Sequence, residues 1–73
     1  MPVTLYTKPR CVQCDATERK FKELGIEYTK LNAPENLEYL KGLGHLQAPV
    51  IITESGQHWS GYQPDKIKEI ISE

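Results

Sequence analysis

The stretch Cys11-Val12-Gln13-Cys14 decides the fold, because it follows the apolar run 3–7 after a three-residue break and opens a helical pattern. A buried strand, a short loop and a helix start are predicted in that order. Backbone N–H groups at a helix N-terminus lack partners within the helix, and the helix dipole adds about half a positive charge there. A thiol at this point is favoured as the thiolate, so we expect its pKa to fall.

Two residues separate Cys11 from Cys14, which places the second sulfur about one helical turn further along the same face. At that spacing the two sulfurs can close a small disulfide ring with little movement of the backbone. The pair therefore predicts a site of thiol–disulfide exchange. A ring with two intervening residues removes little entropy from the unfolded chain, so a purely structural disulfide explains the pair less well.

Two other interpretations of the cysteines stay open. They could supply half of a tetrahedral zinc site together with His45 and His58, although neither histidine stands in the paired spacing typical of such sites. Outside that role, both histidines are expected on the surface, and neither has an acid–base partner at a sequence spacing that would indicate a catalytic pair. Alternatively, the chain is a redox-inert interaction module that keeps the fold and has a disulfide resistant to reduction.

Length and charge exclude several classes of function. The 73 residues are expected to form one domain, 1–73, with a small core. The net charge is −1 with acidic and basic residues interspersed, which speaks against a nucleic-acid-binding face or a polybasic membrane patch. The N-terminus lacks a signal-peptide pattern, and no apolar run approaches the ~20 residues of a membrane span. We therefore expect a soluble, cytoplasmic monomer that binds neither nucleic acid nor membrane.

The first helix and the strand after it are predicted from periodicity. A helix is expected over 12–24, and the glycine at position 25 ends it. Its inner face consists of residues at spacings of three and four: Cys14, Thr17, Phe21 and Leu24. The β-branched and aromatic residues of 26–31 predict a second strand.

The second half of the chain contains two helix starts and a hairpin. A helix is predicted to begin near Pro34. Its expected buried side consists of Leu37, Leu40 and Leu43. Residues 50–53 and 57–60 are predicted strands, joined by a tight turn over 54–56 into an antiparallel hairpin. A last helix starts near Pro64, and its apolar stripe is Ile67, Ile70 and Ile71.

The predicted element order is βαβαββα, which is an α/β fold. The first two strands are joined by a helix, so the right-handed crossover rule makes them parallel. The final hairpin adds an antiparallel strand at one edge. The expected architecture is a four-stranded mixed sheet flanked by three helices.

The segment Ala48-Pro49-Val50 places a proline directly before the most apolar strand. Such a proline removes one backbone donor and is a candidate for a cis bond. Packed beside the cysteines, this turn would present backbone groups to an extended peptide, as in strand addition. Residue statistics alone favour a trans bond, because only about 5% of X–Pro bonds are cis.

Three separated motifs resemble one known family. They are Cys-Val-Gln-Cys at 11–14, Leu-Gln-Ala-Pro-Val at 46–50 and His-Trp-Ser-Gly-Tyr-Gln-Pro-Asp at 58–65. All three are similar to the NrdH-redoxins, small glutaredoxin-like proteins of the thioredoxin fold, and the likeness extends over essentially the whole chain. The resemblance implies the glutaredoxin architecture and a cis bond at Ala48–Pro49.

The resemblance also implies an activity and its partners. These proteins transfer electrons to class Ib ribonucleotide reductase, whose large subunit is the expected partner. Thioredoxin reductase, rather than glutathione, restores the dithiol, so the electrons come from NADPH and the chain is expected to hold no cofactor and no metal.

Individual residues take roles from the same likeness. Cys11 would be the attacking sulfur, Cys14 the resolving sulfur and Pro49 the cis proline beside them. Residues expected to bind partners or to order the loop before the last helix are Val12, Gln13, Ala48, Trp59, Ser60, Gly61, Tyr62, Gln63 and Asp65. A hydrogen-bond network would join this loop, which includes Pro64, to the start of that helix. An exposed apolar area near Val12, Ala48 and Tyr62 would suit a docking surface.

The loop departs from the pattern of ordinary glutaredoxins, which carry a Gly-Gly pair and a Cys-or-Ser-Asp turn that holds the charged ends of glutathione. The corresponding stretch here is 60–65, and Tyr62 puts a bulky ring where that pocket needs small groups. Asp65 could still meet an amine, so glutathione binding is weakened rather than excluded. Lys8 and Arg10 flank the cysteines: they either lower the pKa of Cys11 further or form an ordinary solvated pair of loop charges. Asp15, near Cys14, acts in the opposite sense.

Overall fold

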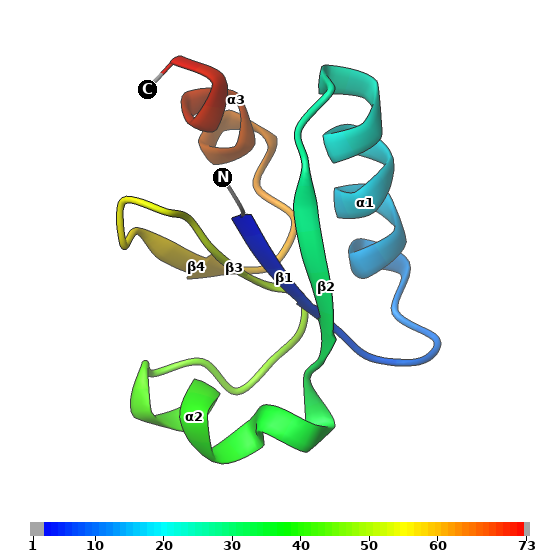
Figure 1. Ribbon diagram of the computed structural model, residues 1–73. Coiled ribbons are helices and arrows are strands. Elements are labelled where there is room, and N and C mark those ends of the chain that lie inside the picture. Colours follow the sequence, from blue (N-terminus) through cyan, green and yellow to red (C-terminus); the bar gives the residue numbers. More distant parts are fainter. Residues whose placement is uncertain (1–2, 73) are drawn as a thin grey trace.

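The computed structural model describes residues 3–72, and the predicted βαβαββα order is confirmed (Figure 1). The first half contains β1 (Val3–Thr7), α1 (Val12–Leu24) and β2 (Tyr28–Asn32). A 3₁₀ turn, η1 (Pro34–Asn36), then leads into α2 (Leu37–Gly42). The second half contains β3 (Val50–Ile52), β4 (His58–Ser60) and α3 (Pro64–Ser72).

The four strands form one mixed sheet in the order β2-β1-β3-β4. Strands β1 and β2 are parallel, as the crossover rule requires, with Val3 opposite Tyr28. Strand β3 runs antiparallel to β1, and β4 runs antiparallel to β3 with Ile51 opposite Trp59. The hairpin therefore attaches to β1 through β3, which leaves β2 and β4 as the two edges. Most of β2 is exposed.

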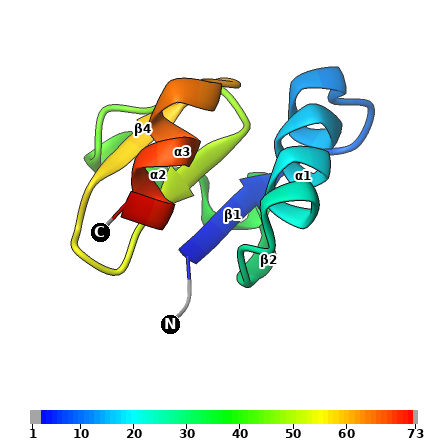
Figure 2. The ribbon, with the colours of Figure 1, turned by 90° about the horizontal axis from the view of Figure 1, so that it is seen from above.

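Helices cover both faces of the sheet. Successive residues of a strand point to opposite faces, so the two central strands, β1 and β3, each contribute to two apolar clusters. One cluster joins α1 and α3 to the sheet: Val3, Leu5, Phe21, Ile51, Trp59 and Ile67. The other lies on the α2 side: Tyr6, Ala33, Leu40 and Val50. Figure 2 shows α1 and α3 along the same face, with α2 beyond the sheet.

The bounds of α1 agree with the sequence, but the strand after it begins later than predicted. Gly25 ends the helix with a left-handed φ of 72°, and the N–H of Ile26 donates to the carbonyl of Phe21. Ile26 thus still belongs to the helix cap, so β2 begins at Tyr28 and extends to Asn32.

One leucine and one isoleucine were wrongly predicted as buried. Leu37 is 42% exposed: it is the first residue of α2, directly after η1, and it lines an open surface groove of about 190 Å³. Ile71 is 53% exposed in the last turn of α3. Leu40 and Ile67 are buried as expected. Within residues 3–72, every helix is too short or too polar to cross a membrane.

Candidate active site

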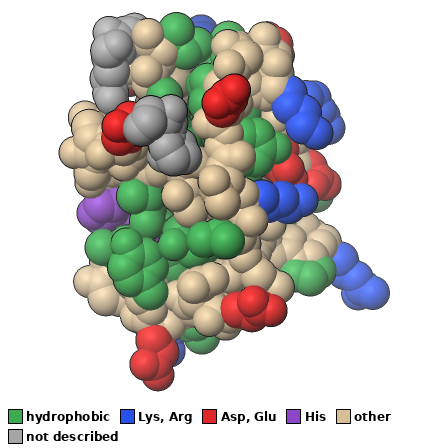
Figure 3. All heavy atoms as spheres, viewed as in Figure 1, with side chains coloured by type: hydrophobic (Ala, Val, Ile, Leu, Met, Phe, Trp, Pro, Cys, Tyr) green, Lys and Arg blue, Asp and Glu red, His purple; other side chains and the backbone are tan. Residues whose placement is uncertain are grey.

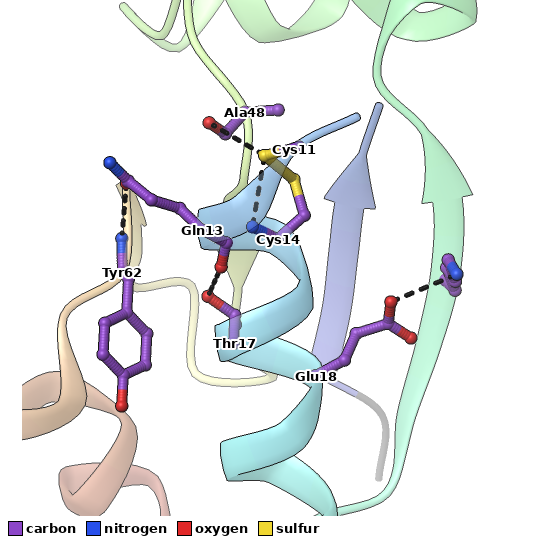
Figure 4. The surroundings of a disulfide bond; sticks show 8 residues. Cys11, Gln13, Cys14, Thr17, Glu18, Ala48 and Tyr62 are labelled. Carbon is purple, nitrogen blue, oxygen red and sulfur yellow. Dashed lines mark hydrogen bonds and ion pairs between the residues drawn. A yellow bond between two sulfur atoms is a disulfide. The ribbon is translucent and has the colours of Figure 1, made fainter. Parts of the chain in front are cut away.

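The first cysteine caps helix α1. Arg10 turns the chain with a φ of 57°, a left-handed value that is uncommon outside glycine, and Cys11 follows in extended conformation as the N-cap residue. The sulfur of Cys11 accepts a hydrogen bond of 3.1 Å from the backbone N–H of Cys14 (Figure 4). One of the unpaired donors of the helix N-terminus therefore points at this sulfur, as predicted from the sequence.

The two sulfurs form a disulfide but differ in accessibility. Cys14 is 2% exposed, whereas Cys11 is 8% exposed and lines an open surface cavity of about 340 Å³. The cavity is lined by Lys8, Arg10, Cys11, Val12, Gln13, Gln47 and Ala48. Cys11 therefore forms part of the cavity wall, whereas Cys14 does not.

The expected cis bond at Ala48–Pro49 is confirmed. The carbonyl oxygen of Ala48 lies 3.9 Å from the sulfur of Cys11, so the proline turn and the cysteine pair form one site. The carbonyl of Pro49 accepts a hydrogen bond of 2.8 Å from the N–H of Gly61. The loop before α3 is thereby attached to the same turn.

Gln13, between the two cysteines, reaches this loop directly. Its side-chain Oε1 accepts a hydrogen bond of 3.2 Å from the backbone N–H of Tyr62 (Figure 4). Its carbonyl accepts a bond of 2.8 Å from the hydroxyl of Thr17, which is fully buried. Gln13 therefore connects the first turn of α1 to a segment near the other end of the chain.

A hydrogen-bond network joins this loop to the start of α3, as the resemblance implied. The side-chain amide of Gln63 donates to the carbonyl of Ser60 at 2.9 Å. The carbonyl of Gln63 accepts from the N–H groups of Lys66 and Ile67, both at 3.1 Å. Asp65 is exposed in the first turn of α3. Gln63 thus holds both the loop and the helix start.

Trp59 contributes to the core. It is 5% exposed and packs in the cluster between the sheet and α1 and α3. Lys66 Nζ lies 5.8 Å from the centre of the indole ring. The indole N–H is buried and has no hydrogen-bond partner, so Trp59 is held by packing in this cluster.

The rim of the cavity carries positive charge. Lys8 and Arg10 line it, and no acidic residue does. Asp15 is exposed in the first turn of α1, with its backbone N–H bonded to the carbonyl of Cys11.

Val12 is 82% exposed beside the cysteines, and Tyr62 is 37% exposed. Val12 and Ala48 line the cavity, but Tyr62 meets it only through its bond to Gln13.

Glu18 connects the outer face of α1 to β2. It accepts a hydrogen bond from the hydroxyl of Tyr28 at 2.8 Å and pairs with Lys30 at 3.1 Å. Burial alone would raise the pKa of Glu18, but the bonds from Tyr28 and Lys30 outweigh it and lower the pKa. Burial and then Glu18 raise the pKa of Tyr28 to about 12. These two interactions attach α1, which carries the cysteines at its start, to β2.

The zinc interpretation that combines Cys11 and Cys14 with both histidines is wrong for residues 3–72, where no group of three or more His, Cys, Asp or Glu could hold a metal. The two histidines instead contact each other, with His45 Nε2 2.7 Å from His58 Nδ1. Both lie at the surface, as expected, but the contact between them was not predicted. They lie 13 residues apart on different elements, and no sequence spacing signals that contact.

Comparisons with known proteins agree with this architecture. The glutaredoxin family model matches residues 3–59. The glutaredoxin-like protein NrdH of Escherichia coli is 38% identical over 96% of this chain and 89% of its own length. The Gene 56 protein of Mycobacterium phage L5 is 34% identical over 96% of this chain and 72% of its own length. The solved structure of E. coli NrdH-redoxin matches with a TM-score of 0.88 over 96% of this chain and 95% of that one.

The fold and the cysteine pair at the start of α1 define a small thiol–disulfide redox protein. The family match and the identity to its relatives show that the chain belongs to the glutaredoxin family, among the NrdH glutaredoxin-like proteins.

Proposed function

We propose that this protein is a dithiol electron donor for class Ib ribonucleotide reductase, itself reduced by thioredoxin reductase at the expense of NADPH. The observation that carries the redox role is the unequal placement of the two cysteines: Cys11 lines the open cavity, whereas Cys14 is 2% exposed and does not line it. The choice of partners rests on the likeness to NrdH proteins. In this scheme the chain needs no bound cofactor and works in the cytoplasm, where thiols are kept reduced.

The exchange begins with Cys11 as nucleophile. In the dithiol form, its thiolate attacks one sulfur of the partner's disulfide, and the other partner sulfur leaves as a thiolate that takes up a proton. The N–H of Cys14 points at the attacking sulfur and stabilises its negative charge. Lys8 and Arg10 on the cavity rim add positive charge around it.

Cys14 completes the cycle. It loses a proton and attacks the sulfur of Cys11 within the mixed disulfide, which releases the second partner sulfur as a thiolate. The partner has gained two electrons and two protons, and Cys11–Cys14 has become the disulfide seen here. Because Cys14 is almost fully buried, it reacts with Cys11 and not with outside molecules.

Partner choice follows from the loop before α3. The N–H of Tyr62 is occupied by Gln13 and its ring is partly exposed, so this turn offers little to the charged ends of glutathione. The E. coli relative is described as a glutaredoxin-like protein with a thioredoxin-like activity profile. Both points support thioredoxin reductase over glutathione as the electron source.

A coupled assay tests the proposal. The purified protein, thioredoxin reductase and insulin as disulfide substrate should together consume NADPH, and Cys11→Ser should abolish that consumption. Rapid turnover with glutathione and glutathione reductase, with none through thioredoxin reductase, would instead assign an ordinary glutaredoxin. The reductase role is tested in the same way, with class Ib ribonucleotide reductase in place of insulin and deoxyribonucleotide formation as the readout.

A further inference from the structure

The pair His45–His58 lies outside the redox site and has no part in the exchange chemistry. His45 follows α2, where its N–H donates to the carbonyl of Leu40 at 2.9 Å. His58 opens β4, opposite Ile52 of β3. Both rings therefore project from backbone positions that hydrogen bonds fix, and Figure 3 shows histidine at the molecular surface. The pair joins the connection between α2 and β3 to the edge strand β4.

The two rings present their nitrogens to each other. His45 Nε2 and His58 Nδ1 are 2.7 Å apart, the ring centroids are 4.9 Å apart and the ring planes are 82° apart. Two nitrogens on one metal ion, each bound at about 2.0–2.1 Å, are separated by about 2.8–3.4 Å for square-planar to tetrahedral angles. The observed separation is just below this range. The two rings face each other along the line between these nitrogens, so each ring would have to turn by about 35–45° for both lone pairs to meet at one ion.

The hydrogens of the pair can be arranged to suit such an ion. A neutral imidazole binds metal through one nitrogen and keeps its hydrogen on the other. In the hydrogen-bonded pair one hydrogen lies between the rings, and moving it to the outer nitrogen of the same ring frees both facing lone pairs.

We propose that His45 and His58 form a two-imidazole surface site for a divalent transition-metal ion, with Cu²⁺ bound more tightly than Ni²⁺ or Zn²⁺. Imidazole is a good ligand for these ions and a poor one for Mg²⁺ or Ca²⁺, and the affinity order peaks at Cu²⁺. Within residues 3–72 no third His, Cys, Asp or Glu joins the pair, so water completes the coordination. A bound ion would hold the segment that leads to Ala48 against β4.

The test is a Cu²⁺ titration of the oxidised protein, in which the disulfide keeps both cysteines from binding metal. Isothermal titration should show one ion per chain, and electron paramagnetic resonance should show nitrogen ligands. His45→Asn and His58→Asn keep a polar side chain and should each weaken binding by more than about tenfold. Gln57→Ala, next to His58, is the matched control and should bind as the wild type does. Circular dichroism confirms that each variant is folded.

The melting temperature is a second readout. Cu²⁺ should raise the melting temperature of the wild type and of Gln57→Ala, but not that of the double variant. The proposal is overturned if the oxidised wild type binds no Cu²⁺, or if the double variant binds it as tightly. Neither result affects the redox assay, because the exchange does not involve these histidines.

Discussion

The side-chain oxygen of Gln13 accepts a hydrogen bond from the backbone N–H of Tyr62, a residue 49 positions further along the chain. Gln13 lies between the two cysteines, and Tyr62 lies in the loop before α3, so this bond fixes one side of the site against the other. The neighbouring bond from Gly61 to the carbonyl of Pro49 attaches the same loop to the cis-proline turn. The cysteines, the proline turn and the loop are thus held as one unit.

Replacing Gln13 should release this loop. Gln13→Leu removes the acceptor at nearly constant volume, and the lost bond should destabilise the loop by about 1 kcal/mol. The backbone amide of Tyr62 should then exchange with solvent several-fold faster in an NMR experiment. Gln13→Glu keeps an acceptor oxygen at the same position, so its Tyr62 amide should stay protected. Equal exchange in all three proteins would show that the bond does not order the loop.

The two cysteines should behave differently when each is replaced. Cys14→Ser leaves an accessible thiol at position 11 without a resolving partner, so it should accumulate mixed disulfides with the partner protein. Cys11→Ser should accumulate none. Non-reducing gels and mass spectrometry identify the adducts. In the reduced wild type, iodoacetamide should alkylate Cys11 faster at neutral pH than it alkylates free cysteine. Equal trapping by both variants would contradict the assigned roles.

Stability should fall in alkaline solution because of Tyr28. Its pKa is raised from the ordinary 10.0 to about 12, by burial first and by Glu18 second. Between these values the folded protein keeps the phenol proton that the unfolded chain has lost. The contribution of this group to stability is therefore complete below pH 10 and lost as the pH rises to 12.

The variant Tyr28→Phe checks this explanation. It should lose about 1 kcal/mol at pH 8, because its bond to Glu18 is gone, and it should show a shallower loss of stability between pH 10 and 12. Urea unfolding at several pH values measures both effects. Tyr62→Phe, at an exposed position, should keep the wild-type dependence. An unchanged slope in Tyr28→Phe would assign the alkaline sensitivity to another group.

Two glycine substitutions should have opposite effects. Gly61 has a φ of 85°, where an alanine costs about 1–2 kcal/mol, and the added Cβ would make only an ordinary 3.5 Å contact with Gln13. Gly61→Ala should therefore lower stability by that amount through the backbone alone. Gly42, in α2, has open space around it, so Gly42→Ala should stabilise by about 0.5–1 kcal/mol. Thermal unfolding compares the two, and destabilisation by both would contradict the backbone explanation.

The sequence predicted those features that depend on local signals. The bounds of α1 were correct because both ends are marked, by Cys11 at the N-cap and by Gly25 at the left-handed end. The apolar strand after Pro49 and the hairpin were recognisable from periodicity and turn residues. The cis bond was expected only from the family resemblance, because residue statistics favour trans.

Features that depend on tertiary packing were not predictable in this way. The attachment of β3 to β1 and the contact between Gln13 and Tyr62 join distant segments, and no local pattern encodes them. The contact between His45 and His58 depends on how the α2–β3 connection lies against β4. Leu37 was predicted as a core residue because the sequence does not show that the α-helix begins only at this residue, after a 3₁₀ turn.

The edge position of β2 affects how the protein behaves at high concentration. A strand at the rim of a sheet carries unpaired backbone groups that can bind the strand of another molecule. Lys30 lies in the middle of β2 and is half exposed, and it is tied to Glu18 of its own chain. Charged lysine side chains on such a strand oppose aggregation, since stacking them would bring like charges together. We therefore expect Lys30 to oppose pairing of β2 with another molecule in concentrated samples.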